Sequence, residues 1–207
     1  MSRRGGSSSR WKQRQERDPY VERAAREGWR SRAVFKLSQI QEKERVLRPG
    51  MRVVDLGASP GGWSQYAARI VGPKGHVWAV DLLPMDPVLG VDFLLGDFTD
   101  PAVLDALKTV IGTEKVDLVM SDMAPNISGM RAVDQPRSMA LAEDALWFAT
   151  ETLARGGTFL VKLFQGEGFP EFVQRSRGEF GTIRLVKPKA SRPESREIYM
   201  LARNYGM

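Results

Sequence analysis

The chain has 207 residues, of which 42% are hydrophobic, and its formal net charge is +6. This length favours a single domain with one core, and no apolar run is long enough to span a bilayer. The absence of cysteine excludes disulfides and thiolate chemistry, and a single histidine argues against a structural zinc site. We therefore expect a cytoplasmic protein without a metal or a membrane partner, and a monomer because no heptad or exposed repeat is present.

The positive charge is concentrated near the N-terminus. Residues 1–32 contain 10 Lys and Arg against 4 Asp and Glu, whereas the other 175 residues carry 21 of each sign. The stretch MSRRGGSSSRWKQRQER is rich in Gly, Ser and Arg and lacks apolar periodicity, which predicts a flexible basic arm over residues 1–30. Such an arm suits contacts with the phosphate backbone of a nucleic acid, and a solubilising tail is the alternative.

Helix and strand patterns alternate after the arm. Strands are expected at residues 50–57, 76–83, 91–98, 115–125, 157–169, 182–188 and 197–203, and helices at 31–47, 61–72, 100–112, 135–157 and 169–178. The last two strands are joined by too few residues for a crossover helix, so we expect an antiparallel hairpin. Five strands with helical crossovers followed by a hairpin predict an α/β fold with a doubly wound, mostly parallel sheet, in one domain over residues 31–207.

A glycine-rich loop, DLGASPGGW, follows the first expected strand. Gly57, Gly61 and Gly62 allow a tight turn and a close approach to a ligand, which makes a merely structural turn the weaker interpretation. The loop lacks the second glycine of the G-x-G-x-x-G pattern, and the chain has no G-K-[ST] motif. An adenosyl compound without phosphates therefore fits better than a dinucleotide, which disfavours a nicotinamide-dependent oxidoreductase.

Two aspartates close the second and third expected strands. Asp81 is placed to accept hydrogen bonds from ribose hydroxyls, and Asp97 could accept from an adenine amino group. Either could instead cap a turn or a helix. The carboxyl ends of parallel strands meet at one edge of the sheet, so both aspartates are expected at the same edge. This shared position favours ligand binding over a capping role.

Lys162 interrupts the apolar strand GTFLVKLF. An ammonium taken out of water is costly unless it is paired, so this lysine needs partners and a reason to be there.

Several of these stretches together resemble the FtsJ/RlmE family of S-adenosylmethionine-dependent ribose 2′-O-methyltransferases. They are DLGASPGGWSQY, DLLPMDP, VGVDFLLGDF, VMSDMAPN, VKLFQGEGF and SREIYMLA, and the likeness runs from about residue 31 to about residue 202. The resemblance implies a Rossmann-like methyltransferase fold with a seven-stranded sheet and an antiparallel last strand. It further implies methylation of a uridine 2′-hydroxyl in large-subunit (23S) ribosomal RNA, in the A loop, on the assembled or maturing subunit. Transfer RNA or an mRNA cap as substrate, and a non-catalytic ribosome-assembly factor, are the alternatives.

The resemblance also assigns roles to residues. It places the family's Lys-Asp-Lys-Glu catalytic set on Lys36, Asp122, Lys162 and Glu197, and its S-adenosyl-L-methionine contacts on Gly61, Trp63, Asp81, Asp97 and Asp122. The loop reads GASPGG where the family pattern has GAAPGG, a mild departure at Ser59.

Methyl transfer to a ribose hydroxyl requires alignment and the management of one proton. By resemblance, Lys162 takes the acceptor role, either removing the hydroxyl proton or steering an oxygen lone pair. Lys36 would be the second cation, and the two carboxylates would orient both lysines. Three of these residues have a plainer alternative: Lys36 could extend to solvent, Asp122 could cap a turn, and Glu197 could form a surface ion pair. Lys162 is the hardest to explain in this way, because both of its sequence neighbours are large and apolar.

Several cations outside this set are candidates for RNA phosphates, with a solvated surface as the alternative. They are the cations of the arm, Arg30, Arg32, Lys187, Lys189, Arg192 and Arg196. Trp11 and Trp29 could either stack on bases or belong to the core.

Overall fold

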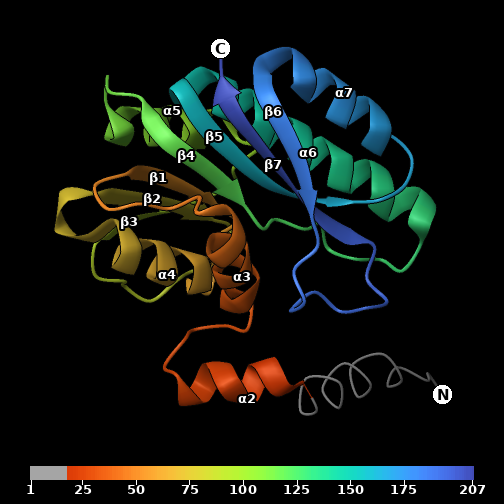
Figure 1. Cartoon of the computed structure of the whole chain (residues 1–207), viewed down its shortest axis with the longest axis horizontal. Coiled ribbons are helices and arrows are strands. Elements are labelled where there is room, and N and C mark those ends of the chain that lie inside the picture. The colour runs from red at the N-terminus through yellow and green to blue at the C-terminus, as the bar shows by residue number, and fades with distance from the viewer. Residues whose placement is uncertain (1–17) are drawn as a thin grey trace.

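The computed structural model describes residues 18–207, and a seven-stranded sheet lies at its centre (Figure 1). The strand order is β3-β2-β1-β4-β5-β7-β6. The strands are β1 (Arg52–Leu56), β2 (His76–Asp81), β3 (Val91–Leu95), β4 (Val116–Ser121), β5 (Leu153–Phe164), β6 (Phe180–Val186) and β7 (Glu197–Tyr205).

Strands β1 to β5 pair in parallel, and β7 runs antiparallel to both of its neighbours, β5 and β6. The strand order reverses at β1, from which β2 and β3 extend to one side and β4 and β5 to the other. This confirms the predicted α/β class, the mostly parallel seven-stranded sheet, the terminal hairpin and the antiparallel last strand.

Helices cover both faces of the sheet. The helices are α3 (Val34–Glu44), α4 (Gly62–Val71), α5 (Pro101–Ile111), α6 (Arg131–Thr152) and α7 (Phe169–Glu179), with a short 3-10 turn η1 (Gly72–Lys74) before β2. Alternate residues of the central strands belong to two separate cores: Val119 packs with α5, α6 and α7, whereas its neighbours Leu118 and Met120 pack with α3 and α4. None of the helices within residues 18–207 combines the length and the apolar character needed to cross a membrane.

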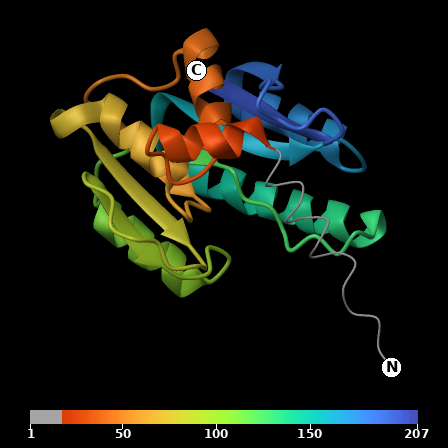
Figure 2. The same ribbon diagram turned by 90° about the horizontal axis from the view of Figure 1, so that it is seen from below.

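Part of the segment predicted as a flexible arm is helical. Residues 1–17 lie outside the described part of the chain, but residues 19–26 form α2 (Pro19–Arg26), which begins at the N-cap Asp18. Ala24 of α2 is buried against Val34, Phe35 and Ala190. The high density of charge hid this short amphipathic helix, whose apolar side is small. Figures 1 and 2 show α2 at the end of the molecule where the β6–β7 loop also lies.

The long helix and the strand after it both begin earlier than predicted. Helix α6 starts at Arg131, tolerates Pro136 inside its first turns, and ends at Thr152. The Gly156–Gly157 pair, interpreted from sequence as the helix stop, lies within β5 instead. Leu153 is extended and pairs with Val116 of β4, so strand pairing outweighs helix propensity there.

A buried carboxyl group ties β1 to the helix that follows the glycine loop. Asp55 is 1% exposed, and its Oδ2 accepts a 2.6 Å hydrogen bond from Ser64 Oγ in the first turn of α4. Burial raises the pKa of Asp55 to about 7, against the opposing effect of the Ser64 hydrogen bond and with smaller contributions from Asp122 and Asp81. The two ends of the glycine loop are thereby held together.

Replacement of this group, Asp55→Asn, should remove a pH dependence of stability. In the unfolded chain the carboxyl ionises near pH 3.8, whereas in the folded protein it keeps its proton up to about pH 7. The free energy of unfolding contributed by this group is therefore fully present below pH 3.8 and falls as pH rises through this window, by at most about 1.4 kcal/mol per pH unit. Urea unfolding of both proteins between about pH 4.5 and about pH 8 measures the difference, because this range covers most of the expected loss. Parallel stability curves for the two proteins would contradict the assignment.

Candidate active site

The predicted functional residues meet at the edge of the sheet where the parallel strands end. Asp122 follows β4, and Lys162 lies near the end of β5. Because β7 is antiparallel, its first residue, Glu197, pairs with Phe164 and reaches the same edge. Lys36 comes from α3, which packs over this part of the sheet.

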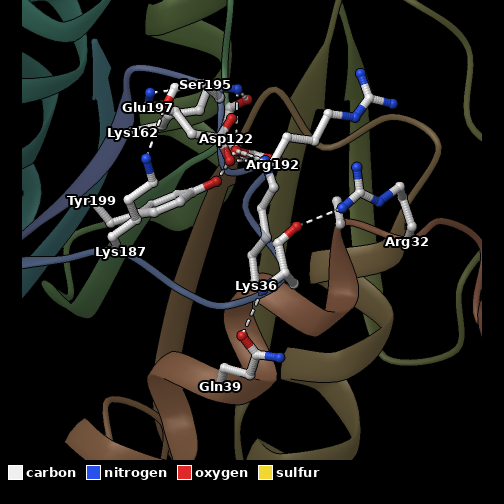
Figure 3. A network of polar contacts seen from close by, with 12 residues as sticks. Arg32, Lys36, Gln39, Asp122, Lys162, Lys187, Arg192, Ser195, Glu197 and Tyr199 are labelled. Atoms are coloured by element: carbon white, nitrogen blue, oxygen red, sulfur yellow. Dashed lines mark hydrogen bonds and ion pairs between the residues drawn. The ribbon is translucent and has the colours of Figure 1, made fainter. Parts of the chain in front are cut away.

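Three ion pairs join these four residues (Figure 3). Lys162 Nζ lies 3.1 Å from Asp122 Oδ1 and also donates a 2.5 Å hydrogen bond to the Asp122 carbonyl oxygen. Lys36 Nζ lies 2.8 Å from Glu197 Oε1 and 3.9 Å from Asp122 Oδ1. The structure thus brings all four predicted catalytic residues into one charge-balanced cluster.

Burial separates this cluster from an ordinary surface network. Only 7% of the Lys162 side chain and 11% of the Lys36 side chain are exposed. Neither lysine extends to solvent, and each is stabilised by a carboxylate that is itself largely buried, as buried charges require. Glu197 Oε1 is itself buried and lies 2.8 Å from Lys36 Nζ, so this carboxylate serves to hold the lysine.

Tyr199 is a member of the cluster that the sequence interpretation missed. It is fully buried, pairs across the strands with Lys162, and donates a 2.5 Å hydrogen bond to Asp122 Oδ1. Burial, assisted by Asp122 and Glu197, raises the pKa of Tyr199 well above its ordinary value, so it stays a hydrogen-bond donor. The signal was present in the sequence, because Glu197 and Tyr199 are two residues apart on one strand and therefore share a face.

The protonation state of Asp122 follows from opposing effects. Burial raises its pKa, but Lys162 and Lys36, together with the hydrogen bond from Tyr199, lower it further than burial raises it. The net pKa lies below the ordinary value of an aspartate, so Asp122 is an anion that holds both lysines in place.

A cavity of about 340 Å³ adjoins the cluster. Four of the predicted ligand-binding residues line it: Gly57, Asp81, Asp97 and Asp122. The other described lining residues are mostly apolar or small: Ser59, Val80, Leu82, Leu83, Phe98, Thr99, Met123, Ala124, Asn126 and Leu141. Asp122 therefore belongs both to the cavity and to the catalytic cluster.

The two strand-end aspartates are held rigidly. Asp81 accepts hydrogen bonds from the backbone N–H of Ser59, at 2.9 Å, and of Leu83, at 2.8 Å. Asp97 Oδ1 accepts from the N–H and the hydroxyl of Thr99, which lower the pKa of Asp97, the hydroxyl most strongly. Both aspartates thus shape their turns, as the plainer interpretation required, and also present carboxylate oxygens to the cavity.

The three glycines of the loop have different surroundings. At Gly57, with φ +78°, an added Cβ would lie 2.4 Å from Met123 Cγ, so only glycine fits between the loop and the residue after Asp122. Gly61, with φ +106°, is the N-cap of α4, and a Cβ there would meet Met85 and Arg30. Gly61 and Gly62 do not line the cavity.

Trp63, a predicted cofactor contact, is also outside the cavity lining. It is 3% exposed, and its indole N–H donates to the carbonyl of Ala33 at 2.9 Å. Its ring centroid lies 5.7 Å from that of Tyr199. The structure therefore places Trp63 as a support for Tyr199.

Several cations predicted to contact RNA are engaged within the protein. Arg30 donates to the carbonyls of Asp86 and Pro87. Arg32 pairs with Asp18 at 2.9 Å and donates to the Ala190 carbonyl, which fastens α2 to the β6–β7 loop. Lys187 donates to Ser195 O and Arg196 to Gln165 O. Trp29 packs against Tyr66, and Trp11 lies outside the described residues.

The cavity suits an adenosyl compound with a positive charge. Its lining includes three carboxylates, and no lysine or arginine occurs among the described residues that form it. Phosphates would find no cation there, whereas ribose hydroxyls, an adenine amino group and a sulfonium would all meet acceptors or negative charge. The residues present thus fit S-adenosyl-L-methionine.

Comparisons with known proteins agree with this geometry. The crystal structure of a protein from Plasmodium falciparum, assigned as a ribosomal RNA methyltransferase, matches with a TM-score of 0.78 and 28% identity, over 86% of this chain and 98% of that one. A structure from Clostridium thermocellum, assigned as an rRNA methylase, has a TM-score of 0.57 at 18% identity, over 81% of this chain and 96% of that one, and shares the fold. A model of the FtsJ-like methyltransferase family matches residues 29–205. Because this match covers nearly all of the described residues, the chain belongs to the FtsJ-like methyltransferase family.

Proposed function

We propose that this chain methylates the ribose 2′-hydroxyl of a uridine in 23S ribosomal RNA, in the A loop of the assembled or maturing large subunit, with S-adenosyl-L-methionine as methyl donor. The observation that carries the proposal is the buried Lys162–Asp122 pair, joined to Lys36 and Glu197 beside a carboxylate-lined cavity. We propose that it acts as a monomer in the cytoplasm.

The cavity residues divide into those that hold the donor and one that links it to the acceptor. When bound, S-adenosyl-L-methionine supplies a methyl group already activated by its sulfonium charge. Asp81 and Asp97 would accept hydrogen bonds from its sugar and base, and the apolar side chains beside them would exclude water. Asp122 lines the donor cavity and also pairs with Lys162 of the catalytic cluster, so it sets the position of the lysines relative to the donor.

The cluster then has to align one hydroxyl and dispose of its proton. Lys162 is held by two contacts to Asp122, which fixes its Nζ and leaves a remaining N–H for the acceptor oxygen. That hydrogen bond occupies one lone pair and directs the other toward the methyl group. Glu197 holds Lys36 at 2.8 Å, so that Lys36 supplies the second positive charge of the cluster, and the hydroxyl proton passes to solvent as the methyl group is transferred.

Three features support RNA of the ribosome as the acceptor. A 2′-hydroxyl is found in RNA and not in DNA, and the excess positive charge of the chain suits a polyphosphate. The Plasmodium falciparum protein of similar structure is described as a ribosomal RNA methyltransferase.

Mapping of 2′-O-methyl groups tests the substrate directly. Large subunits from cells lacking this protein are incubated with the purified chain and radiolabelled S-adenosyl-L-methionine, with transfer RNA and capped mRNA in parallel reactions. A new methyl group on one uridine of 23S RNA is expected. Label in transfer RNA or the cap alone would reassign the substrate, and no label in any RNA would favour a non-catalytic assembly factor.

Replacement of the central lysine, Lys162→Ala, should abolish turnover while leaving donor binding intact. The acceptor oxygen loses its aligning group, and we expect kcat to fall by about a hundredfold or more. Lys162 is not among the residues that line the donor cavity, so the Kd for S-adenosylhomocysteine should stay within about threefold of wild type. Lys43→Ala, an exposed lysine of α3, is the matched control. Near wild-type turnover by Lys162→Ala would refute the catalytic role.

Removal of the strand-end carboxylate, Asp81→Ala, should weaken donor binding instead. The variant loses an acceptor for the ribose hydroxyls and also frees the Ser59 and Leu83 amides. We expect the Kd for S-adenosylhomocysteine, measured by calorimetry, to rise about tenfold or more. Asp105→Ala on the exposed side of α5 is the control, and equal affinities of the two variants would argue against Asp81 as a ligand.

A further inference from the structure

A second polar cavity, of about 360 Å³, lies at the opposite edge of the sheet from the catalytic cluster. It is formed where β1, β4 and β5 begin and where β7 ends. Four arginines line it: Arg45, Arg48, Arg155 and Arg203. In Figure 1 the C-terminus marks this end of the sheet, and α2 and the β6–β7 loop mark the other.

The arginines of this cavity carry more positive charge than nearby carboxylates balance. Within residues 18–207, Arg45, Arg48 and Arg155 make no side-chain hydrogen bond or ion pair, and all three are exposed. Arg203 is different, because it is held by Glu44, which also pairs with Arg184. A cavity that gathers three unpaired guanidinium groups has a positive potential and attracts an anion.

The single acidic residue in the described lining, Asp117, offsets only one of these positive charges. Asp117 Oδ2 accepts a 2.8 Å hydrogen bond from the backbone N–H of Arg52, so it serves the start of β1. The other described lining residues are small, polar or apolar, and none is aromatic: Val46, Met51, Ala154, Gly156, Gly157, Thr158 and Asn204. A nucleobase would find no ring to stack on, whereas a phosphate suits the arginine fork.

A β-bulge shapes this cavity. The pairing of β4 with β5 passes from Val116–Leu153 to Leu118–Thr158, so residues 154–157 bulge opposite Asp117. Gly156 adopts φ +82° inside the bulge, and Arg155 is carried on it. Bulges of this kind redirect side chains at the edges of sheets, and here the bulge directs an arginine to the cavity.

We propose that this arginine cavity binds a backbone phosphate of the substrate RNA, far from the nucleotide that is methylated. The inference rests on the proposed function for the identity of the RNA. Along β7, the six steps from Glu197 to Arg203 span about 20 Å at about 3.3 Å per residue. An RNA that reaches both sites must therefore extend well beyond the acceptor nucleotide, which favours a large folded substrate over a short oligonucleotide.

The experiment compares a cavity variant with a charge-matched control on two substrates. The cavity variant is Arg45→Gln/Arg48→Gln/Arg155→Gln, which leaves Arg203 and its structural ion pair in place. The control is Lys74→Gln/Arg131→Gln/Arg177→Gln, three exposed cations outside the cavity. The substrates are unmethylated large subunits and a short RNA hairpin that carries the acceptor loop.

We expect the cavity variant to raise the KM for large subunits by about tenfold, with kcat within about twofold of wild type. Its KM for the hairpin should match that of the control. The slope of log affinity against log salt for the large subunit should decrease in magnitude by about 1 for each phosphate that the variant no longer neutralises. A KM and a salt slope equal to those of the control would overturn the proposal.

Two further outcomes distinguish failure of the proposed function from failure of the phosphate-binding proposal. If wild-type protein methylates neither substrate, the proposed function fails, and filter binding of wild type and variant to large subunits still tests the cavity. If the cavity binds inorganic phosphate or pyrophosphate, seen as a thermal shift that is absent in the variant, while RNA binding is unchanged, the site belongs to a free anion and the RNA proposal is refuted.

Discussion

The site depends on one constraint, which is the presence of two lysine ammonium groups away from water. Each would be strongly destabilising alone, so the carboxylates of Asp122 and Glu197 have to lie within ion-pair distance of them. Asp122 has further contacts, because it also accepts a hydrogen bond from the Tyr199 hydroxyl and lines the donor cavity. The positions of α3, β4, β5 and β7 relative to one another are fixed by these few contacts as well as by the core.

The direction of β7 makes this convergence possible. If β7 ran parallel to β5, Glu197 would lie at the far edge of the sheet, about 20 Å from Asp122 and Lys162. The antiparallel insertion between β5 and β6 instead delivers Glu197 and Tyr199 to the edge where the parallel strands end. The same direction carries Arg203 to the opposite edge, so one strand connects the catalytic cluster to the arginine cavity.

The sequence predicted the fold well because the fold depends on strong local signals, whereas the set Lys36, Asp122, Lys162 and Glu197 was assigned by resemblance to the family. Apolar runs bounded by glycine predicted the strands. Lys162 stood out because it is a charged residue inside such an apolar run. The parts that were missed depend on tertiary contacts. Helix α2 is defined by the packing of Ala24 on Ala190, far along the chain, and Trp63 faces Tyr199, which no periodicity in its own helix could show. The end of α6 was misplaced because the pairing of Leu153 with Val116 was invisible locally.

The contact between Gly57 and Met123 has a thermodynamic consequence. Met123 directly follows Asp122, and the glycine loop packs against it so closely that no side chain fits at position 57. A molecule that orders the loop also restricts the backbone that carries the catalytic carboxylate. Donor and acceptor binding should then be cooperative, and linkage requires the enhancement to be equal in both directions. Through this one short contact, each substrate would thus bind more tightly once the other is in place.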